Sequence, residues 1–171
     1  ADPARAAVLA VIRAKAYGWS GEAPNTVLEA VSLAEKSQKS VPGAAADLLR
    51  LRLAMLTRAG RFGDVEKLFS KRRDKSILND WKIWFEALDR LESQKKPRAP
   101  AKTVASVGAR VATIRGFPAL DQAEIIQAKA LLRAGDPERA VTVARHVIDR
   151  GSPSGPAWVL YANALESAGN F

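Results

Sequence analysis

The chain carries an internal repeat with a spacing of 34 residues. Residues 121–136 (DQAEIIQAKALLRAGD) align with residues 155–170 (GPAWVLYANALESAGN) when one segment is shifted by 34 positions. The shift aligns small residues, leucines and helix breaks: Ala128 with Ala162, Leu131 with Leu165, and Ala134-Gly135 with Ala168-Gly169. A period of this length, built as a helix, a glycine-containing turn and a second helix, is typical of stacked helical repeats. Such proteins usually bind partners, and we expect binding here.

The composition supports a helical fold. Apolar residues make up 47% of the 171 residues, whereas aromatic residues make up only 6%. Much of the apolar content is alanine, which favours helices whose backbones approach closely and suits a large sheet core poorly. We therefore predict an all-α fold, a right-handed α-solenoid of antiparallel helix pairs with a basic insertion.

Helix boundaries can be read from capping residues and from apolar spacing. Gly60, Gly135 and Gly169 each follow an apolar helical pattern, and glycine is favoured where a helix ends in a left-handed residue. Asp136 precedes Pro137, which predicts an N-cap followed by a proline at the first helical position. Inward-facing stripes with helical spacing are expected on three further helices: Val27, Ala30, Val31 and Ala34; Leu49, Leu53 and Leu56; and Val65, Leu68 and Phe69.

Two segments place similar residue types at matching positions of a helix pair. Residues 121–154 supply Ala128, Leu131, Gly135 and Ala140, and residues 155–171 supply Trp158, Ala162, Leu165 and Gly169. These positions resemble the tetratricopeptide repeat (TPR), which has large and small residues on its first helix, glycine at the turn and alanine on the second helix. Residues 46–79 fit less closely and also resemble the related pentatricopeptide repeat. The TPR resemblance implies stacked helix pairs with a concave groove, and it implies a buried Trp158.

The same resemblance assigns a partner-binding groove to first-helix residues that lie off the apolar stripe. By register these include four basic residues: Arg50, Arg58, Lys129 and Arg133. Family members that clamp a peptide carboxylate use a basic residue followed four positions later by an asparagine. Here Arg50 is followed at that spacing by Ala54, which argues against such a clamp. The expected partner is a protein helix or an acidic segment, and the expected role is that of a scaffold or adaptor.

The 34-residue period fails between residues 80 and 120. The step from residue 80 to residue 121 is 41 residues, which is seven more than one repeat. A helix is expected from Trp81 to Ser93, a linker from residue 94 to 100, and another helix from Thr103 to Ile114. We predict three regions: helical hairpins in 1–93, a basic linker with an extra helix in 94–120, and TPR-like repeats in 121–171. The last repeat stops before its second helix, so we expect the native chain to continue.

A second pattern spans this interruption. Asn79-Asp80-Trp81 follows a helical repeat, and a charged loop then leads to Arg115-Gly116 and Leu120 ahead of another helix. This arrangement, within residues 46–134, resembles the non-catalytic large subunit of NatB-type N-terminal acetyltransferases. The resemblance implies a complex subunit that wraps a catalytic partner and touches the ribosome.

Positive charge is concentrated in the middle third of the chain. The net charge is +9, and residues 67–115 hold 13 Lys or Arg against 5 Asp or Glu. A clustered positive field favours polyanions such as RNA, or an acidic protein surface, although an ordinary solvated surface is the alternative. Trp81 and Trp84 beside this charge are either stacking platforms for bases or packing residues between helices. RNA binding is thus the alternative to a scaffold, with these candidate residues: Lys71, Arg72, Arg73, Lys75, Lys95, Lys96 and Arg98.

Residue types that usually carry catalysis or hold cofactors are scarce. The chain has no cysteine, and His146 is its only histidine, which excludes thiol chemistry and histidine-pair metal sites. No Gly-rich phosphate loop occurs. We therefore expect no enzyme activity, no cofactor and no metal. No apolar run reaches the roughly 20 residues that a membrane span needs, and we leave the compartment open, with the cytoplasm favoured over an exported or organellar location.

Overall fold

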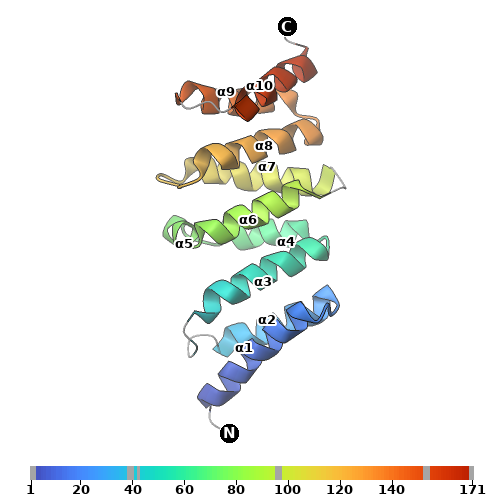
Figure 1. Cartoon of the computed structure of the whole chain (residues 1–171), viewed down its shortest axis with the longest axis vertical. Helices are drawn as coiled ribbons and strands as arrows, with labels where there is room; N and C mark the ends of the chain where they lie inside the picture. Colours follow the sequence, from blue (N-terminus) through green and yellow to red (C-terminus); the bar gives the residue numbers. More distant parts are fainter. Residues whose placement is uncertain (1–2, 38–40, 42, 95–97, 152–154, 170–171) are drawn as a thin grey trace. The chain divides into compact units, whose positions relative to one another are not determined.

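The described part of the chain consists of helices joined by turns. A computed structural model gives the positions of residues 3–37, 41, 43–94, 98–151 and 155–169, and within these residues it contains no strand. Figure 1 shows the helices following one another along the chain. The predicted all-α fold class is therefore confirmed. None of the described helices combines the length and the apolar character that crossing a membrane requires.

Contacts between helices divide the chain into two units, residues 1–65 and residues 66–171. The first unit holds α1 (Pro3–Trp19), α2 (Pro24–Ser37), α3 (Ala44–Arg58) and the start of α4 (Phe62–Ser70). Within it, α2 packs against both α1 and α3, and α1 also contacts α3. Val27, Val31 and Ala34 are fully buried, which confirms the inward-facing stripe predicted for α2.

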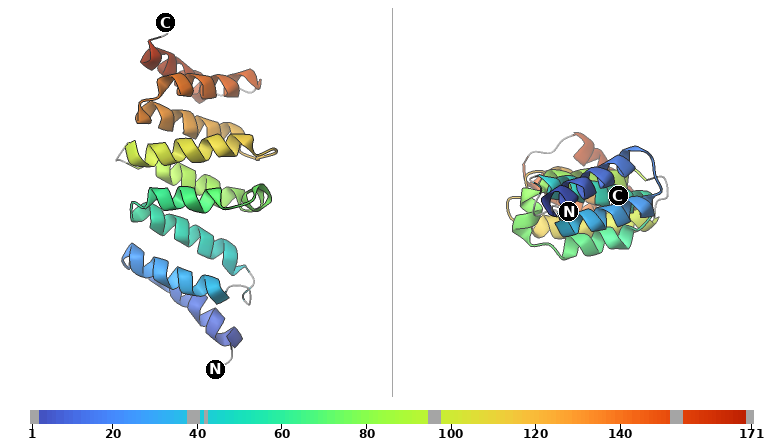
Figure 2. Two further views of the ribbon diagram at one scale, coloured as in Figure 1. Left: turned by 180° about the vertical axis from the view of Figure 1, so that it is seen from behind. Right: turned by 90° about the horizontal axis from the view of Figure 1, so that it is seen from below.

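The second unit holds the rest of α4 and six further helices: α5 (Asp74–Asn79), α6 (Trp81–Glu92), α7 (Arg98–Thr113), α8 (Leu120–Ala134), α9 (Pro137–Asp149) and α10 (Gly155–Ala168). From α6 onward each helix packs against the next one along the chain. In addition, α6 contacts α8, and α8 contacts α10, so alternate helices touch as well. Figures 1 and 2 show the chain reversing direction between successive helices of this unit.

The predicted helix ends have the expected backbone geometry. Gly60, Gly135 and Gly169 lie in the left-handed region, with φ of 70°, 83° and 69°. At the start of α9, the Asp136 side chain accepts a hydrogen bond from the Arg139 backbone N–H at 3.4 Å. The turns of the repeat are therefore set by residue types that can be recognised in the sequence.

The helix α7 differs from its prediction. It begins at Arg98, five residues before the predicted Thr103, and its side chains Ala101, Val104 and Val111 are fully buried. The segment predicted as a linker with an extra helix thus contributes a helix that packs between neighbours as the others do. The reason is that its apolar residues keep helical spacing although the 34-residue period is lost. The division between the units follows Val65, whereas the predicted boundaries are residues 93 and 120.

The prediction of a buried Trp158 is wrong. This side chain is 51% exposed, because it lies on a flank of α10 that no described helix covers. Ala157, Leu160 and Ala164, on another side of α10, are the residues buried against neighbouring helices. The prediction also lacks α5, a helix of six residues that is too short to carry a periodic apolar pattern.

We expect close packing between α7 and α8 to make Gly108→Ala destabilising. A Cβ at Gly108 would lie 2.7 Å from the Cβ of Gln127, an atom that moves only with the backbone of α8. The expected loss in the free energy of unfolding is about 1–3 kcal/mol. The control is Gly63→Ala in α4, where nothing lies within 4 Å and a gain of about 0.4–1 kcal/mol is expected. Urea denaturation followed by circular dichroism measures both, and a neutral Gly108→Ala would contradict the contact.

Candidate functional site

A groove in the second unit is lined mainly by apolar side chains, with charged groups among them. Its volume is about 540 Å³. Three helices contribute to it: α6 through Glu92, α8 through Lys129, Leu132 and Arg133, and α10 through Pro156, Val159, Leu160 and Asn163. The combination of an apolar lining with a few polar groups is typical of surfaces that bind another molecule.

Two of the four predicted groove residues, Lys129 and Arg133, lie together in this groove. Their spacing of four residues places them on one face of α8. The Arg133 guanidinium is paired with the Glu92 carboxylate at 2.9 Å, whereas Lys129 is exposed and makes no ion pair with any described residue. Lys129 is therefore the available cation of the groove.

The α10 side of the groove was absent from the prediction. Val159 and Asn163 follow Ile125 and Lys129 by 34 positions, so the repeat register that identified the α8 residues also identifies them. Glu92 could not be found in this way, because it precedes the region where the register holds.

The other two predicted groove residues lie in the first unit, on α3. Arg50 is exposed, with its guanidinium 3.8 Å from the Asp47 carboxylate. Arg58 is exposed at the end of the helix. No pocket of the described residues includes either of them among the pockets that we identify. Their assignment to a partner-binding groove stays a prediction.

Exposed basic residues gather at one end of the helices in the second unit. We define the basic edge as Lys71, Arg73, Lys75, Lys82 and Arg115, which are all exposed and form no ion pair with the described residues. Two contacts bring their segments together. The Trp81 and Phe117 rings meet edge to face with centroids 6.3 Å apart, and Arg110 donates to the backbone carbonyl oxygens of Ser70 and Arg72 at 2.8 and 2.7 Å.

Other cations of the same region are used within the fold. The Arg72 guanidinium lies 3.5 Å from the Asp80 carboxylate and 5.8 Å from the centre of the Trp84 ring. Arg110 lies over the Phe69 ring at 5.4 Å while it binds the two carbonyl groups. These arginines stabilise helix ends, where cations are favoured, and Arg72 is less available to a polyanion than predicted.

The two tryptophans considered for base stacking differ in accessibility. Trp84 is 1% exposed and packs edge to face on Phe69 with centroids 4.8 Å apart, so it is a packing residue and its stacking role is excluded in this conformation. Trp81 is half-buried against Phe117, and the Lys82 ammonium lies 5.7 Å from its ring centre. Of the remaining candidates, Lys95 and Lys96 lie outside the described residues, and Arg98 opens α7.

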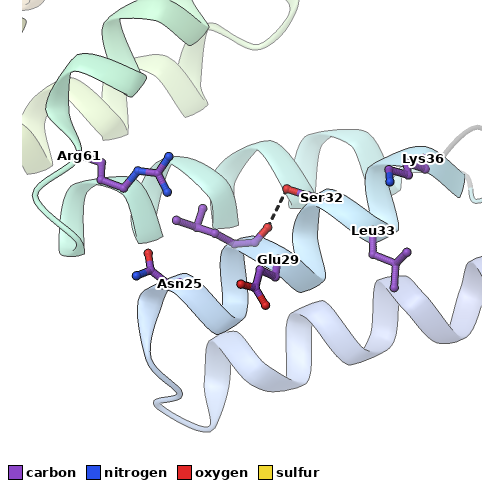
Figure 3. A pocket seen from close by; sticks show the side chains of 7 residues that line it. Asn25, Glu29, Ser32, Leu33, Lys36 and Arg61 are labelled. Atoms are coloured by element: carbon purple, nitrogen blue, oxygen red, sulfur yellow. Dashed lines mark hydrogen bonds between the residues drawn. The ribbon is translucent and has the colours of Figure 1, made fainter.

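The first unit has a polar hollow along α2, shown in Figure 3. Its charged groups are largely engaged. Arg61 is paired with Asp64 at 2.8 Å, and the Ser32 hydroxyl donates to the Leu28 carbonyl oxygen at 2.8 Å while it accepts from Arg52. We therefore do not rank this hollow above the groove. It has a volume of about 570 Å³ and is lined by Asn25, Leu28, Glu29, Ser32, Leu33, Lys36 and Arg61.

A buried carboxylate links α8 to the end of α9. Glu124 is 4% exposed and accepts a hydrogen bond from the Arg150 guanidinium, which also donates to Asp121 at 2.9 Å. Hydrogen bonding to Glu124 raises the pKa of Arg150 above its ordinary value, while burial acts in the opposite direction. Because arginine stays protonated in proteins, this cluster is a fixed ion pair between two helices. It is not an acid–base pair.

Metal-binding geometry is likewise missing from the described residues. Among them, no group of three or more His, Asp or Glu side chains could hold a metal ion. The single histidine, His146, is exposed on α9.

Comparison with known proteins yields no match: no protein-family model, no curated protein and no solved structure. The resemblances to tetratricopeptide repeats and to the NatB subunit therefore stay predictions. The groove and the basic edge are the two surfaces from which a function can be argued.

We expect Arg150→Met to destabilise the second unit, because it would leave the Glu124 carboxylate buried without a partner. The expected loss in the free energy of unfolding is about 1–3 kcal/mol, and adding Glu124→Gln should restore part of it. The control is Arg145→Met, since Arg145 and Asp149 form an exposed pair at 3.6 Å, worth at most about 0.5 kcal/mol. Equal effects of Arg150→Met and Arg145→Met in urea denaturation would contradict the structural role of Arg150.

Proposed function

We propose that the chain is a non-catalytic scaffold or adaptor that binds a protein partner, built as a right-handed α-solenoid of TPR-like helix pairs. Three observations support the solenoid: the 34-residue register, the left-handed glycines at Gly135 and Gly169, and the contacts between alternate helices of the second unit. Because each helix buries its apolar stripe only against neighbours, such an array offers a long surface for binding.

The observation that carries the proposal is the groove between α8 and α10. Leu132 and Val159 give it an apolar lining, and Lys129 provides one unpaired cation among the described residues. This combination suits a helix or extended segment that carries an apolar side chain and a nearby carboxylate. A role as subunit of a larger complex, including the acetyltransferase complex implied by the second resemblance, is compatible with this groove but does not follow from it.

Selection from a displayed library of random 12-residue peptides tests the groove. We expect the selected peptides to pair acidic and apolar residues. Their affinity for the chain, measured by fluorescence anisotropy, is expected to fall at least about tenfold in Val159→Asp and Lys129→Glu, as for central interface residues. Two exposed residues of α1 give matched controls, Leu9→Asp and Arg5→Glu.

The result against the proposal is equally clear. If the selected peptides bind Val159→Asp and Lys129→Glu as they bind the parent chain, the groove is not the binding surface. If the controls lose affinity as well, the change reflects charge or folding and not a specific site.

A second candidate function is RNA binding by the basic edge. It is favoured by a specific arrangement: five exposed cations lie at one end of the helices, while the nearby acids Asp74 and Asp80 face Arg110 and Arg72. The half-buried Trp81 beside Lys82 is the one remaining candidate for stacking on a base.

Salt dependence tests this candidate. If all five cations contact phosphates of a single-stranded RNA, the slope of log K against log salt should be about −3.5. The triple substitution Lys71→Ala, Lys75→Ala and Lys82→Ala should make it less steep by about 2, whereas Arg5→Ala on α1 should leave it unchanged. An electrophoretic or anisotropy titration with a uridine oligomer measures the slope. Absence of binding at low salt removes the candidate.

A further inference from the structure

The two flanks of α10 differ when α10 is compared with α8 through the 34-residue shift. One flank is buried in both helices: Ala123, Ile126 and Ala130 in α8, and Ala157, Leu160 and Ala164 in α10. The other flank is buried in α8 alone. There Glu124, Ala128 and Leu131 are at most 4% exposed, whereas their counterparts in α10 are the 51% exposed Trp158, the exposed Ala162 and the half-buried Leu165.

In α8, the helix α9 covers this flank. Ala144 packs in one cluster with Ala128, and Ala140 packs in another with Leu131. Arg150, directly after α9, binds the Glu124 carboxylate. The covering face of α9 is therefore a stripe of small residues at Ala140, Ala144 and Val147, and its opposite face is polar.

The counterpart flank on α10 keeps the features that admit a helix. Ala162 repeats Ala128 as the small residue at the crossing point, which allows two helix backbones to approach closely. Leu165 repeats Leu131, and the turn glycine Gly169 repeats Gly135 with a similar φ. The ring of Trp158 meets that of Tyr161 edge to face at 6.5 Å, which extends the apolar surface. An exposed patch of this kind usually marks an interaction site.

We propose that the α10 flank formed by Trp158, Ala162 and Leu165 docks an amphipathic helix of a separate protein, which takes the position on α10 that α9 takes on α8. This partner helix presents small residues at the spacing of Ala140, Ala144 and Val147. Where α9 is followed by Arg150, the partner presents an apolar residue, because Trp158 replaces the carboxylate of Glu124 and leaves a cation there without its pair.

The inference does not depend on the groove. It rests on the comparison of α8 with α10, and the groove is lined by a different set of α10 residues, including Val159 and Asn163. The failure of one site in its experiment therefore leaves the other to be judged by its own result.

A synthetic peptide that copies α9 provides the probe. It has the sequence of residues 136–151 with Arg150→Leu, a fluorescent label, and a lactam bridge from Glu138 to a lysine at position 142, since an unconstrained helix of this length is marginal in water. We expect saturable binding to the whole chain below about 1 mM, the weak end of specific binding. Trp158→Asp should weaken it at least about tenfold, and Leu9→Asp on α1 should leave it unchanged.

Each outcome decides the proposal. The half-exposed position of Trp158 makes an unfolded Trp158→Asp variant unexpected, and circular dichroism checks this. Absence of saturable binding, equal binding by Trp158→Asp, or equal binding of a peptide that also carries Ala140→Asp and Ala144→Asp would overturn it. Self-association of the chain that Trp158→Asp abolishes would overturn it as well, because the occupant would then be a second copy.

Discussion

The second unit depends on the close approach of helix backbones through alanine side chains. Ala128, Ala140, Ala144 and Ala164 are at most 1% exposed and belong to two small clusters that join α8, α9 and α10. Alanine at a crossing point shortens the distance between helix axes, and the backbones themselves then supply much of the dispersion contact. Each contact buries little apolar area, so a single helix pair gains little stability. The helices are stable because each has neighbours on more than one side.

Arginine side chains supply the polar part of this packing. Arg110 joins α7 to the carbonyl groups at the end of α4, and Arg150 joins the end of α9 to Glu124 in α8. Part of the net charge of +9 therefore belongs to the fold and is not free for a partner. This distinction separates the five residues of the basic edge from the larger basic segment that the composition indicates.

The sequence predicts the structure well where local rules and the repeat register agree. The helix ends at Gly60 and Gly135 and the cap at Asp136 follow from residue types that have one main use at such positions. The register fails over α7, yet α7 packs as its neighbours do, because burial requires only an apolar stripe and not a fixed spacing between helices. Trp158 was misplaced because residue type was taken as a measure of burial, whereas burial depends on whether a neighbouring helix covers that flank. Glu92 could not be assigned to the groove, since its pairing with Arg133 joins residues 41 positions apart without a shared motif.

The electrostatics of the groove limit what it can select. Arg133 is already compensated by Glu92, so a partner carboxylate gains attraction mainly from Lys129. An exposed ion pair of this kind is worth only about 0.2–1 kcal/mol, which is too little to hold a partner by itself. Apolar contacts with Leu132 and Val159 must supply most of the affinity, at about 25 cal/mol for each Å² buried. It follows that an acidic segment without apolar anchors binds weakly here, and that the groove distinguishes partners by the spacing between an apolar side chain and a carboxylate.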